Sequence, residues 1–260
     1  MNSIILLDSD GTLRHNDGSI SKRTIDIIEK LKENNYIILA SGRPRYHVKE
    51  VAQKAGISPY IVSANGAEVY DYINDKVLYS SFVEPDIALK LIECAYKFDI
   101  RFLFESGNIE YVTKDVHNNN EVLLKDNYKE IIQKGGIKQC MFITDNKNLL
   151  EKVWGYVENT LKIKVSDFYD KSCISRDSYW FSICNKTSSK GKALKFLSKH
   201  FKIENTIAIG NNYNDLSMFK ASKTSVCVDN ALPDIKEKAK VIVPSNDLDG
   251  VAIYLEKIKK

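Results

Sequence analysis

The sequence has no pair of closely spaced cysteines. Its 260 residues include five cysteines, an odd number, which are spread from Cys94 to Cys227 without a C-x-x-C pair. A disulfide framework needs paired cysteines, and a zinc site needs ligands at short, fixed spacings. The pattern therefore predicts reduced thiols in a cytoplasmic protein.

Long apolar runs are also missing. No stretch approaches the roughly 18 apolar residues that span a membrane. The run from Ile4 to Leu7 is too short for a signal peptide, and no basic flank precedes it. These absences predict an intracellular protein that does not bind membranes.

Charge of one sign does not dominate either. The chain has 38 basic and 34 acidic residues, a formal net charge of +4, and only the end Lys257–Lys260 concentrates lysines. This balance offers no case for nucleic-acid binding. Gly and Pro are few (12 and 5), while 43% of the residues are hydrophobic and 28% are charged, as in a well-packed globular protein.

Both ends of the chain have the pattern of an α/β protein. Ile4–Leu7 and Tyr36–Ala40 are continuous apolar runs, typical of strands that are buried on both faces of a parallel sheet. Between them, Thr24–Leu31 has an apolar stripe with helical spacing. Near the other end, a helix that begins near Ser189 and a buried strand at Thr206–Ile209 indicate the same architecture.

The pattern changes between residues 82 and 184. Helical segments at Pro85–Phe98 and Asn146–Thr160 alternate there with amphipathic strands such as Arg101–Phe104 and Tyr179–Ile183. We therefore expect a core domain of residues 1–81 and 185–260, into which residues 82–184 are inserted as an α+β domain.

Two carboxylates follow the first predicted strand directly. The segment Asp8-Ser9-Asp10-Gly11-Thr12 would lie at the carboxyl edge of the sheet, where open α/β proteins have their sites. Two acids one residue apart can act as a nucleophile and a general acid/base. Asp, Ser and Gly are also ordinary turn residues, but D-x-D-G-T arises by chance in only about one in several hundred chains of this length.

This D-x-D-G-T segment resembles the first motif of the haloacid dehalogenase superfamily. Three further segments are similar to the other motifs of that family and follow in the same order: Ser41-Gly42, Lys190 in Ser189-Lys190-Gly191, and Gly210–Asp215. A lysine in the first turn of a helix faces the positive end of the helix dipole, an unfavourable place unless an anion lies nearby. The order of the motifs carries the resemblance.

The fourth segment departs from the family pattern G-D-x-x-N-D at one position. Asn214 and Asp215 match the pattern, whereas Asn211 stands where the family usually has a metal-binding aspartate. An amide oxygen can still ligate Mg²⁺, but the site loses one negative charge. We expect weaker metal binding or a stronger dependence on Asp215, and the change leaves room for an impaired enzyme.

Two more segments, Ser63–Ala67 and Ser245–Ala252, resemble the Cof-type branch of the superfamily. That branch carries a large α/β cap of the C2B type, inserted after the second motif. The resemblance thus implies an α/β fold with a Rossmann-like core and a parallel sheet, into which residues 82–184 are inserted as a cap that selects the substrate. Three cap side chains suggest substrate contact, although nothing in the sequence ranks them: His117, Arg176 and Trp180.

The resemblance implies a magnesium-dependent phosphatase whose partner is a small phosphorylated metabolite. Asp8 would attack phosphorus and form an aspartyl-phosphate, Asp10 would be the general acid and base, and Lys190 would stabilise the transferring group. Mg²⁺ would be held by Asp8, the backbone carbonyl of Asp10, Asn211 and Asp215. The residues implied at the substrate phosphate, or in support of it, are Thr12, Ser41, Gly42, Arg43, Asn65 and Asn214.

Two other functions stay open. A sugar phosphomutase would use the same Asp8 and Asp10 to return the phosphoryl group to a sugar instead of to water. A phosphometabolite-binding protein without turnover would explain Asn211, but the retention of Lys190 and Asp215 beside the two acids argues against a decayed site. The sequence indicates neither the particular substrate nor the oligomeric state.

Overall fold

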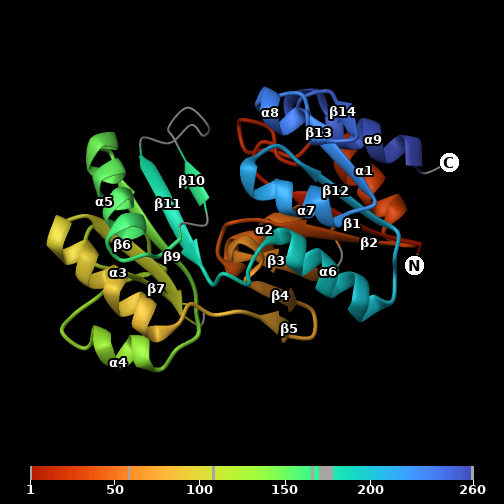
Figure 1. The fold of residues 1–260 in the computed structure, drawn as a ribbon. Coiled ribbons are helices and arrows are strands. Elements are labelled where there is room, and N and C mark those ends of the chain that lie inside the picture. Colours follow the sequence, from red (N-terminus) through yellow and green to blue (C-terminus); the bar gives the residue numbers. More distant parts are fainter. Residues whose placement is uncertain (1, 58, 107–108, 165–166, 170–177, 259–260) are drawn as a thin grey trace. The chain divides into compact units, whose positions relative to one another are not determined.

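The computed structural model describes residues 2–57, 59–106, 109–164, 167–169 and 178–258 (Figure 1). The chain forms two compact units. The first unit is Met1–Ser80 together with Ser188–Lys260, and the second unit is Ser81–Thr187. Arg176, which was named above, and Cys173, one of the five cysteines, lie outside the described residues.

The first unit is built on a mostly parallel sheet. In its described residues eight strands follow the order β14-β13-β12-β1-β2-β3-β4-β5. The strands from β14 to β3 are parallel, and β4 and β5 form an antiparallel hairpin at one edge. The bounds are β1 Ser3–Asp8, β2 Asn35–Ala40, β3 Tyr60–Ser63, β4 Glu68–Asp71, β5 Lys76–Ser80, β12 Thr206–Gly210, β13 Thr224–Val228 and β14 Val241–Val243.

Helices cover both faces of this sheet. Ser21 and Ser189 cap α1 and α6, because each serine hydroxyl accepts a hydrogen bond from the backbone N–H three residues later. The α-helices are α1 Lys22–Leu31, α2 Arg45–Lys54, α6 Lys190–Phe201, α7 Leu216–Ala221, α8 Pro233–Lys236 and α9 Gly250–Ile258, and the 3₁₀ turns are η1 Ala64–Gly66, η3 Tyr213–Asp215 and η4 Asn246–Leu248.

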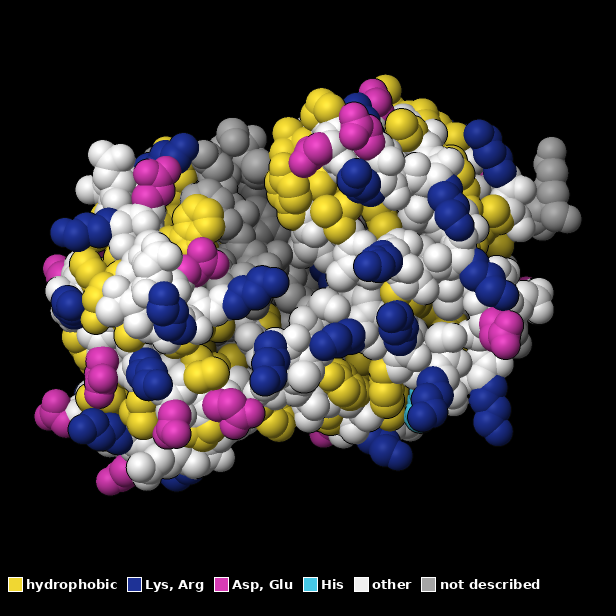
Figure 2. Space-filling model, viewed as in Figure 1, with side chains coloured by type: hydrophobic (Ala, Val, Ile, Leu, Met, Phe, Trp, Pro, Cys, Tyr) yellow, Lys and Arg dark blue, Asp and Glu magenta, His cyan; other side chains and the backbone are white. Residues whose placement is uncertain are grey.

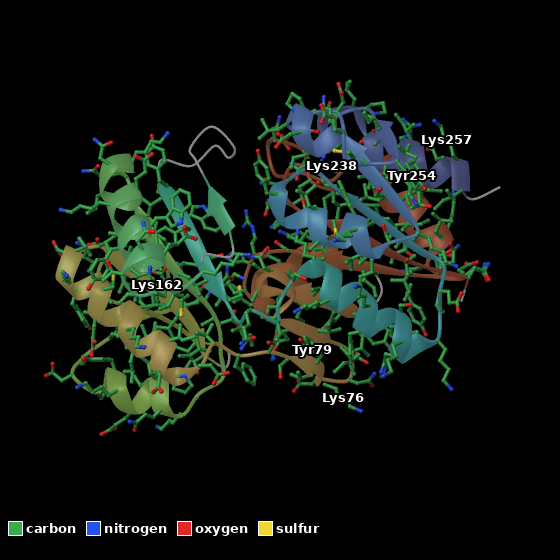
Figure 3. The ribbon with its side chains drawn as sticks, in the orientation of Figure 1. Lys76, Tyr79, Lys162, Lys238, Tyr254 and Lys257 are labelled. Atoms are coloured by element: carbon green, nitrogen blue, oxygen red, sulfur yellow. The ribbon has the colours of Figure 1, made fainter. Side chains whose placement is uncertain are left out.

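The helices on the two faces of the sheet explain why the run Ile4–Leu7 is apolar throughout, since each face has its own core. Ile5 and Leu7 of β1 belong to the core under α1, α2 and α9, whereas Ile4 and Leu6 belong to the core under α6, α7 and α8. All four side chains are fully buried, so truncating any of them to alanine should cost about 2–5 kcal/mol. The edge hairpin of β4 and β5 packs against the layer of α6, α7 and α8, because the ring of Tyr79 in β5 contacts the ring of Phe196 in α6. Tyr79 is labelled in Figure 3.

The second unit has its own sheet and its own core. Its described strands follow the order β10-β11-β9-β6-β7-β8, and an aromatic cluster of Phe102, Phe104, Phe142 and Phe181 packs with apolar residues of the helices. The pattern of residues 82–184 did not predict β9, which pairs with both β6 and β11. The bounds are α3 Pro85–Phe98, β6 Arg101–Ser106, β7 Ile109–Val112, β8 Glu121–Leu123, α4 Tyr128–Gln133, β9 Ile137–Thr144, α5 Lys147–Asn159, β10 Asp167–Tyr169 and β11 Tyr179–Cys184.

The two ends of the second unit lie side by side. The hydroxyl groups of Ser81 and Thr187 form a hydrogen bond of 2.8 Å. The Asn185 side chain also donates to the backbone carbonyl of Phe82, at 2.7 Å. The chain therefore enters and leaves this unit at one point.

Lys and Arg side chains are scattered over the face shown in Figure 2 and do not gather into a single patch. Among the described residues, no helix is both long enough and apolar enough to cross a membrane.

Candidate active site

Three of the four motif segments meet at one edge of the first sheet because neighbouring parallel strands end there, and the remaining segment, with Lys190, begins helix α6. Asp8 is the last residue of β1, Ser41 follows β2 and Asn211 follows β12, and both β2 and β12 pair with β1 in register. Gly11 has a φ of +73°, a left-handed conformation that allows the chain to turn sharply after Asp10. Strand order alone thus collects segments that are far apart in the sequence.

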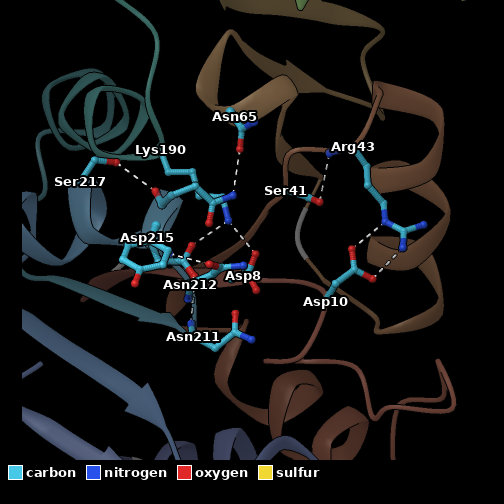
Figure 4. Close-up of polar contacts among 12 residues, drawn as sticks. Asp8, Asp10, Ser41, Arg43, Asn65, Lys190, Asn211, Asn212, Asp215 and Ser217 are labelled. Atoms are coloured by element: carbon cyan, nitrogen blue, oxygen red, sulfur yellow. Dashed lines mark hydrogen bonds and ion pairs between the residues drawn. The ribbon is translucent and has the colours of Figure 1, made fainter. Parts of the chain in front are cut away.

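Lys190 joins two carboxylates in the interior of the site (Figure 4). Its Nζ donates to Oδ1 of Asp8 at 2.6 Å and to Oδ1 of Asp215 at 2.7 Å. The side chains of Lys190 and Asp215 are fully buried, and that of Asp8 is 9% exposed. An unpaired charge at this depth would cost several kcal/mol, so the buried Lys190 is stable only because both carboxylates lie within hydrogen-bond distance of it.

The electrostatics of this group are dominated by burial. The pKa of Asp8 is raised to about 7, mainly by burial and also by the Asp215 carboxylate, while Lys190 acts in the opposite direction. Burial also acts to lower the pKa of Lys190, but the Asp215 and Asp8 carboxylates outweigh it and the pKa stays above its usual range. The lysine is therefore charged, and a further cation beside Asp8 would favour its ionised form.

Asp215 also closes the loop that follows β12. Its Oδ2 accepts hydrogen bonds from the backbone N–H groups of Asn211 at 2.9 Å and Asn212 at 3.0 Å. Gly210 is required beside it, because a Cβ at that position would overlap the Asp215 carboxylate. Oδ2 of Asp215 thus fixes the loop conformation, while Oδ1 accepts the hydrogen bond from Lys190.

Asn211 leaves one oxygen available. Its side-chain Oδ1 is buried and has no hydrogen-bond partner among the described residues, and its amide nitrogen abuts Gly11. The described residues contain no group of three His, Cys, Asp or Glu side chains that could hold a metal ion. The carboxylates of Asp8 and Asp215, the backbone carbonyl of Asp10 and the amide oxygen of Asn211 are a donor set that suits Mg²⁺, with less negative charge than a set containing a third carboxylate.

Asp10 lies in a different environment from Asp8. Its carboxylate receives two hydrogen bonds from Arg43, Nε to Oδ2 at 2.6 Å and Nη2 to Oδ1 at 2.9 Å. Arg14 adds a third, Nη1 to Oδ1 at 2.8 Å. Figure 4 shows the Asp10 side chain directed toward Arg43 and away from the group around Lys190. Arg14 did not emerge from the motifs, and its position four residues after Asp10 is the signal that could have identified it.

The residues expected at the substrate phosphate include a set linked by polar contacts between the end of β2 and η3: Ser41, Asn65 and Asn214, with Gly42 beside Asn65. The backbone N–H of Asn65 donates to the Ser41 carbonyl at 3.1 Å, and the Asn214 side chain donates to Asn65 Oδ1 at 3.0 Å. A Cβ on Gly42 would lie 3.0 Å from Asn65 Oδ1. The Asn65 Nδ2, the Asn214 Oδ1 and the Thr12 hydroxyl are buried without a partner in the described part of the chain. The hydrogen-bonding capacity of these atoms is not used by any described residue.

The start of α6 is held by the loop after β3. Gly66 has a φ of +91°, and a Cβ there would overlap the backbone carbonyl group of Ser189 and crowd the Lys190 nitrogen. The segment Ser63–Ala67 therefore fixes the helix turn that presents Lys190.

Two of the three suggested side chains of the second unit can be placed. His117 is exposed, and its backbone N–H donates to Glu121. Trp180 of β11 is half-buried and pairs with Ile143 of β9. Neither contact indicates a ligand.

A carboxylate at the end of a central parallel strand, a buried lysine that joins it to a second acid, and an inserted α/β unit define a hydrolase of the haloacid dehalogenase type. The chain matches the family of haloacid dehalogenase-like hydrolases over residues 5–255 and belongs to it. It is a phosphoric monoester hydrolase of that family.

Similarity to known proteins extends over the whole chain. A putative phosphatase of Buchnera aphidicola subsp. Baizongia pistaciae is 27% identical, with 98% of this chain and 97% of the relative covered. The pyridoxal phosphate phosphatase YbhA of Escherichia coli is 24% identical, with 97% of each covered. The haloacid dehalogenase subclass IIB sugar phosphatase BT4131 has the same fold, with a TM-score of 0.79, 18% identity and 99% of each chain covered. The expected Cof-type architecture is confirmed.

Proposed function

We propose that the protein is a magnesium-dependent phosphatase that hydrolyses a small phosphorylated metabolite through an aspartyl-phosphate on Asp8. The observation that carries this proposal is the buried contact of Lys190 with both Asp8 and Asp215 at the carboxyl edge of the sheet. A lysine in this place can neutralise the charge of a transferring phosphoryl group without further reorganisation.

In the first step, an oxygen of Asp8 forms a bond to phosphorus as the bond from phosphorus to the leaving oxygen breaks. Asp10 supplies the proton that the leaving oxygen needs. In the second step, Asp10 takes a proton from water, whose oxygen attacks phosphorus and releases Asp8 with inorganic phosphate. Lys190 stays charged and stabilises both steps, which rely on positioning and electrostatics.

Mg²⁺ would be held by Asp8, the backbone carbonyl of Asp10, Asn211 and Asp215. The unpartnered Oδ1 of Asn211 supports this assignment, because a buried amide oxygen without a hydrogen bond is costly unless a ligand satisfies it. When bound, the cation neutralises the phosphate oxygens and keeps Asp8 ionised.

The phosphate oxygens would be bound on the opposite side by Ser41, Gly42 and Asn65. The free Asn65 Nδ2 supports this role, and Asn214 holds Asn65 in place. Thr12 would support the loop after β1. Residues 82–184, which fall within the second unit, would act as the cap that selects the substrate.

The proposal is tested by measuring phosphate release from sugar phosphates, pyridoxal phosphate and flavin mononucleotide, with and without Mg²⁺. We expect release only with the metal, and a loss of at least about 1000-fold in Asp8→Asn because the nucleophile is removed. Asp26→Asn is the matched control, since Asp26 is exposed on α1 of the same unit.

Other outcomes would favour the rival functions. Transfer of phosphate between positions of a sugar without release would indicate a phosphomutase. Tight binding without any turnover at high Mg²⁺ would indicate the binding protein, the alternative that Asn211 favours.

A further inference from the structure

Two arginines and one acid form a separate charged group beside the proposed nucleophile. Arg14 and Arg43 together direct three N–H groups to the Asp10 carboxylate, at 2.6 to 2.9 Å. The group of three side chains carries a net charge of +1. The side chains are 22%, 24% and 32% exposed for Arg14, Arg43 and Asp10, so solvent reaches all of them.

Arg14 is held in this place by its own surroundings. Its Nε donates to the carbonyl of Gly18 at 3.0 Å, and its backbone carbonyl accepts from the buried Asn246 side chain at 2.9 Å. Gly18 has a φ of +85°, and a Cβ there would crowd the guanidinium. The guanidinium is therefore preorganised, which lowers the entropic cost of binding an anion.

Asp10 cannot fulfil two roles in one position. A general acid must come within hydrogen-bond reach of the leaving oxygen. In the structure, the Asp10 carboxylate is instead bound by the arginines and directed away from Asp8 (Figure 4). When Asp10 turns toward the leaving oxygen, Arg14 and Arg43 lose their anion, and their combined charge of +2 is left without a carboxylate.

We propose that Arg14 and Arg43 bind a second anionic group of the substrate, a carboxylate or a second phosphate, which takes the place that Asp10 occupies here. The Asp10 carboxylate shows that this place accepts an anion with fork-shaped guanidinium contacts. Binding of the second anion releases Asp10 for proton transfer, so substrate recognition and the positioning of the acid are coupled. This inference rests on the proposed phosphatase function and names its substrate class.

The test compares pairs of phosphate esters that differ only in the second anion. Phosphoglycolate is paired with 2-hydroxyethyl phosphate, and glucose 1,6-bisphosphate is paired with glucose 6-phosphate. We expect kcat/KM to be about 10- to 100-fold higher for the anionic member of at least one pair, since hydrogen bonds between charged groups are the strong ones. The first pair reports a carboxylate, and the second reports a phosphate.

Variants of Arg14 assign the effect to this group. In Arg14→Leu the advantage of the anionic member should fall below about 3-fold, with KM rising more for that member than for its neutral partner. Arg14→Lys keeps the positive charge but loses the paired N–H donors of the guanidinium, so part of the preference for the anionic substrate should remain. This variant replaces Arg14→Leu in the test if the leucine variant does not fold. Arg23→Leu removes an exposed arginine from the same unit and should behave as the native protein.

A native enzyme that treats both members of each pair alike would overturn the inference while leaving the phosphatase intact. So would an advantage that survives in Arg14→Leu, because Arg14 would then only support its loop. If no compound releases phosphate, the proposed function fails. Calorimetric binding of phosphoglycolate and 2-hydroxyethyl phosphate to Asp8→Asn then tests the anion site alone, and equal affinities would refute it.

Discussion

The Nζ of Lys190 lies 2.6 Å from Oδ1 of Asp8, although 182 positions separate the two residues in the chain. Asp8 is fixed by the end of β1, and Lys190 is fixed by the Ser189 cap and by the close approach of Gly66. The contact thus depends on both segments of the first unit, and under the proposed mechanism it links stability to catalysis.

Replacing Lys190 with methionine should reduce both properties. The buried carboxylates of Asp8 and Asp215 would lose their shared cation, at a cost of about 3–5 kcal/mol in the free energy of unfolding. Phosphate release should fall by at least about 100-fold. Urea unfolding and a phosphate assay measure the two effects. Lys192→Met changes a neighbouring lysine in the exposed part of α6 and should alter stability by less than about 0.5 kcal/mol. Equal behaviour of the two variants would contradict the assignment.

Replacing Asn211 with aspartate should strengthen metal binding. The variant restores a third carboxylate, so the Mg²⁺ concentration for half-maximal activity should fall by about tenfold. Without the metal, repulsion from Asp8 and Asp215 should lower Tm by about 3 °C, and MgCl₂ should reverse this loss. Thermal melts with and without MgCl₂ check it. Asn34→Asp, at an exposed site, should show no such metal dependence. If the Tm of the variant does not change when MgCl₂ is added, the metal does not bind at residue 211.

Replacing Gly66 with alanine should displace the start of α6. Both Gly66 and Gly135 have positive φ angles, but a Cβ on Gly66 would overlap the Ser189 backbone, whereas a Cβ on Gly135 would meet no atom within 4 Å. Gly135→Ala should therefore cost only the backbone strain, about 1 kcal/mol. Gly66→Ala should cost more and also reduce kcat, since Lys190 would shift. Thermal unfolding and kinetics of the pair separate steric overlap from strain, and similar values for both would refute the overlap.

The buried cysteines should react slowly with thiol reagents. Burial raises the pKa of Cys94 and of Cys227 to about 11, and it raises the pKa of Cys140 even more. At pH 8 a thiol with a pKa of 11 is ionised to only about one part in a thousand, and each added pH unit should raise its rate about tenfold. The variant Cys173→Ser leaves only the four cysteines that the structure describes as buried, and in this variant Ellman's reagent should detect thiols only after denaturation. Rapid reaction of a thiol in the folded variant would show that one of the buried cysteines is accessible.

Sequence patterns predicted the first unit well because burial on both faces leaves a continuous apolar signal. The predicted run Tyr36–Ala40 lies within β2, and the predicted run Ile4–Leu7 lies within β1. The meeting of the motif segments could also be predicted, since the ends of neighbouring parallel strands share an edge.

Other features depend on tertiary contacts that no local pattern carries. Strand β9 begins with Ile137-Lys138-Gln139, whose polar residues interrupt an apolar run, and the buried Lys138 pairs with Glu105 of β6 at 2.8 Å. The pairing of Asp10 with Arg43 is similar, because side-chain direction is set by partners distant in sequence.

The hydrogen bond between Ser81 and Thr187 has a consequence for how such a chain can evolve. Because the inserted segment starts and ends at one point, exchanging it for another segment alters only the length of a single connection in the first unit, and loop length affects stability weakly. Each unit has its own apolar core, so neither must be repacked when the other is replaced. The architecture is modular: the inserted unit can be exchanged by recombination while the first unit keeps its sequence.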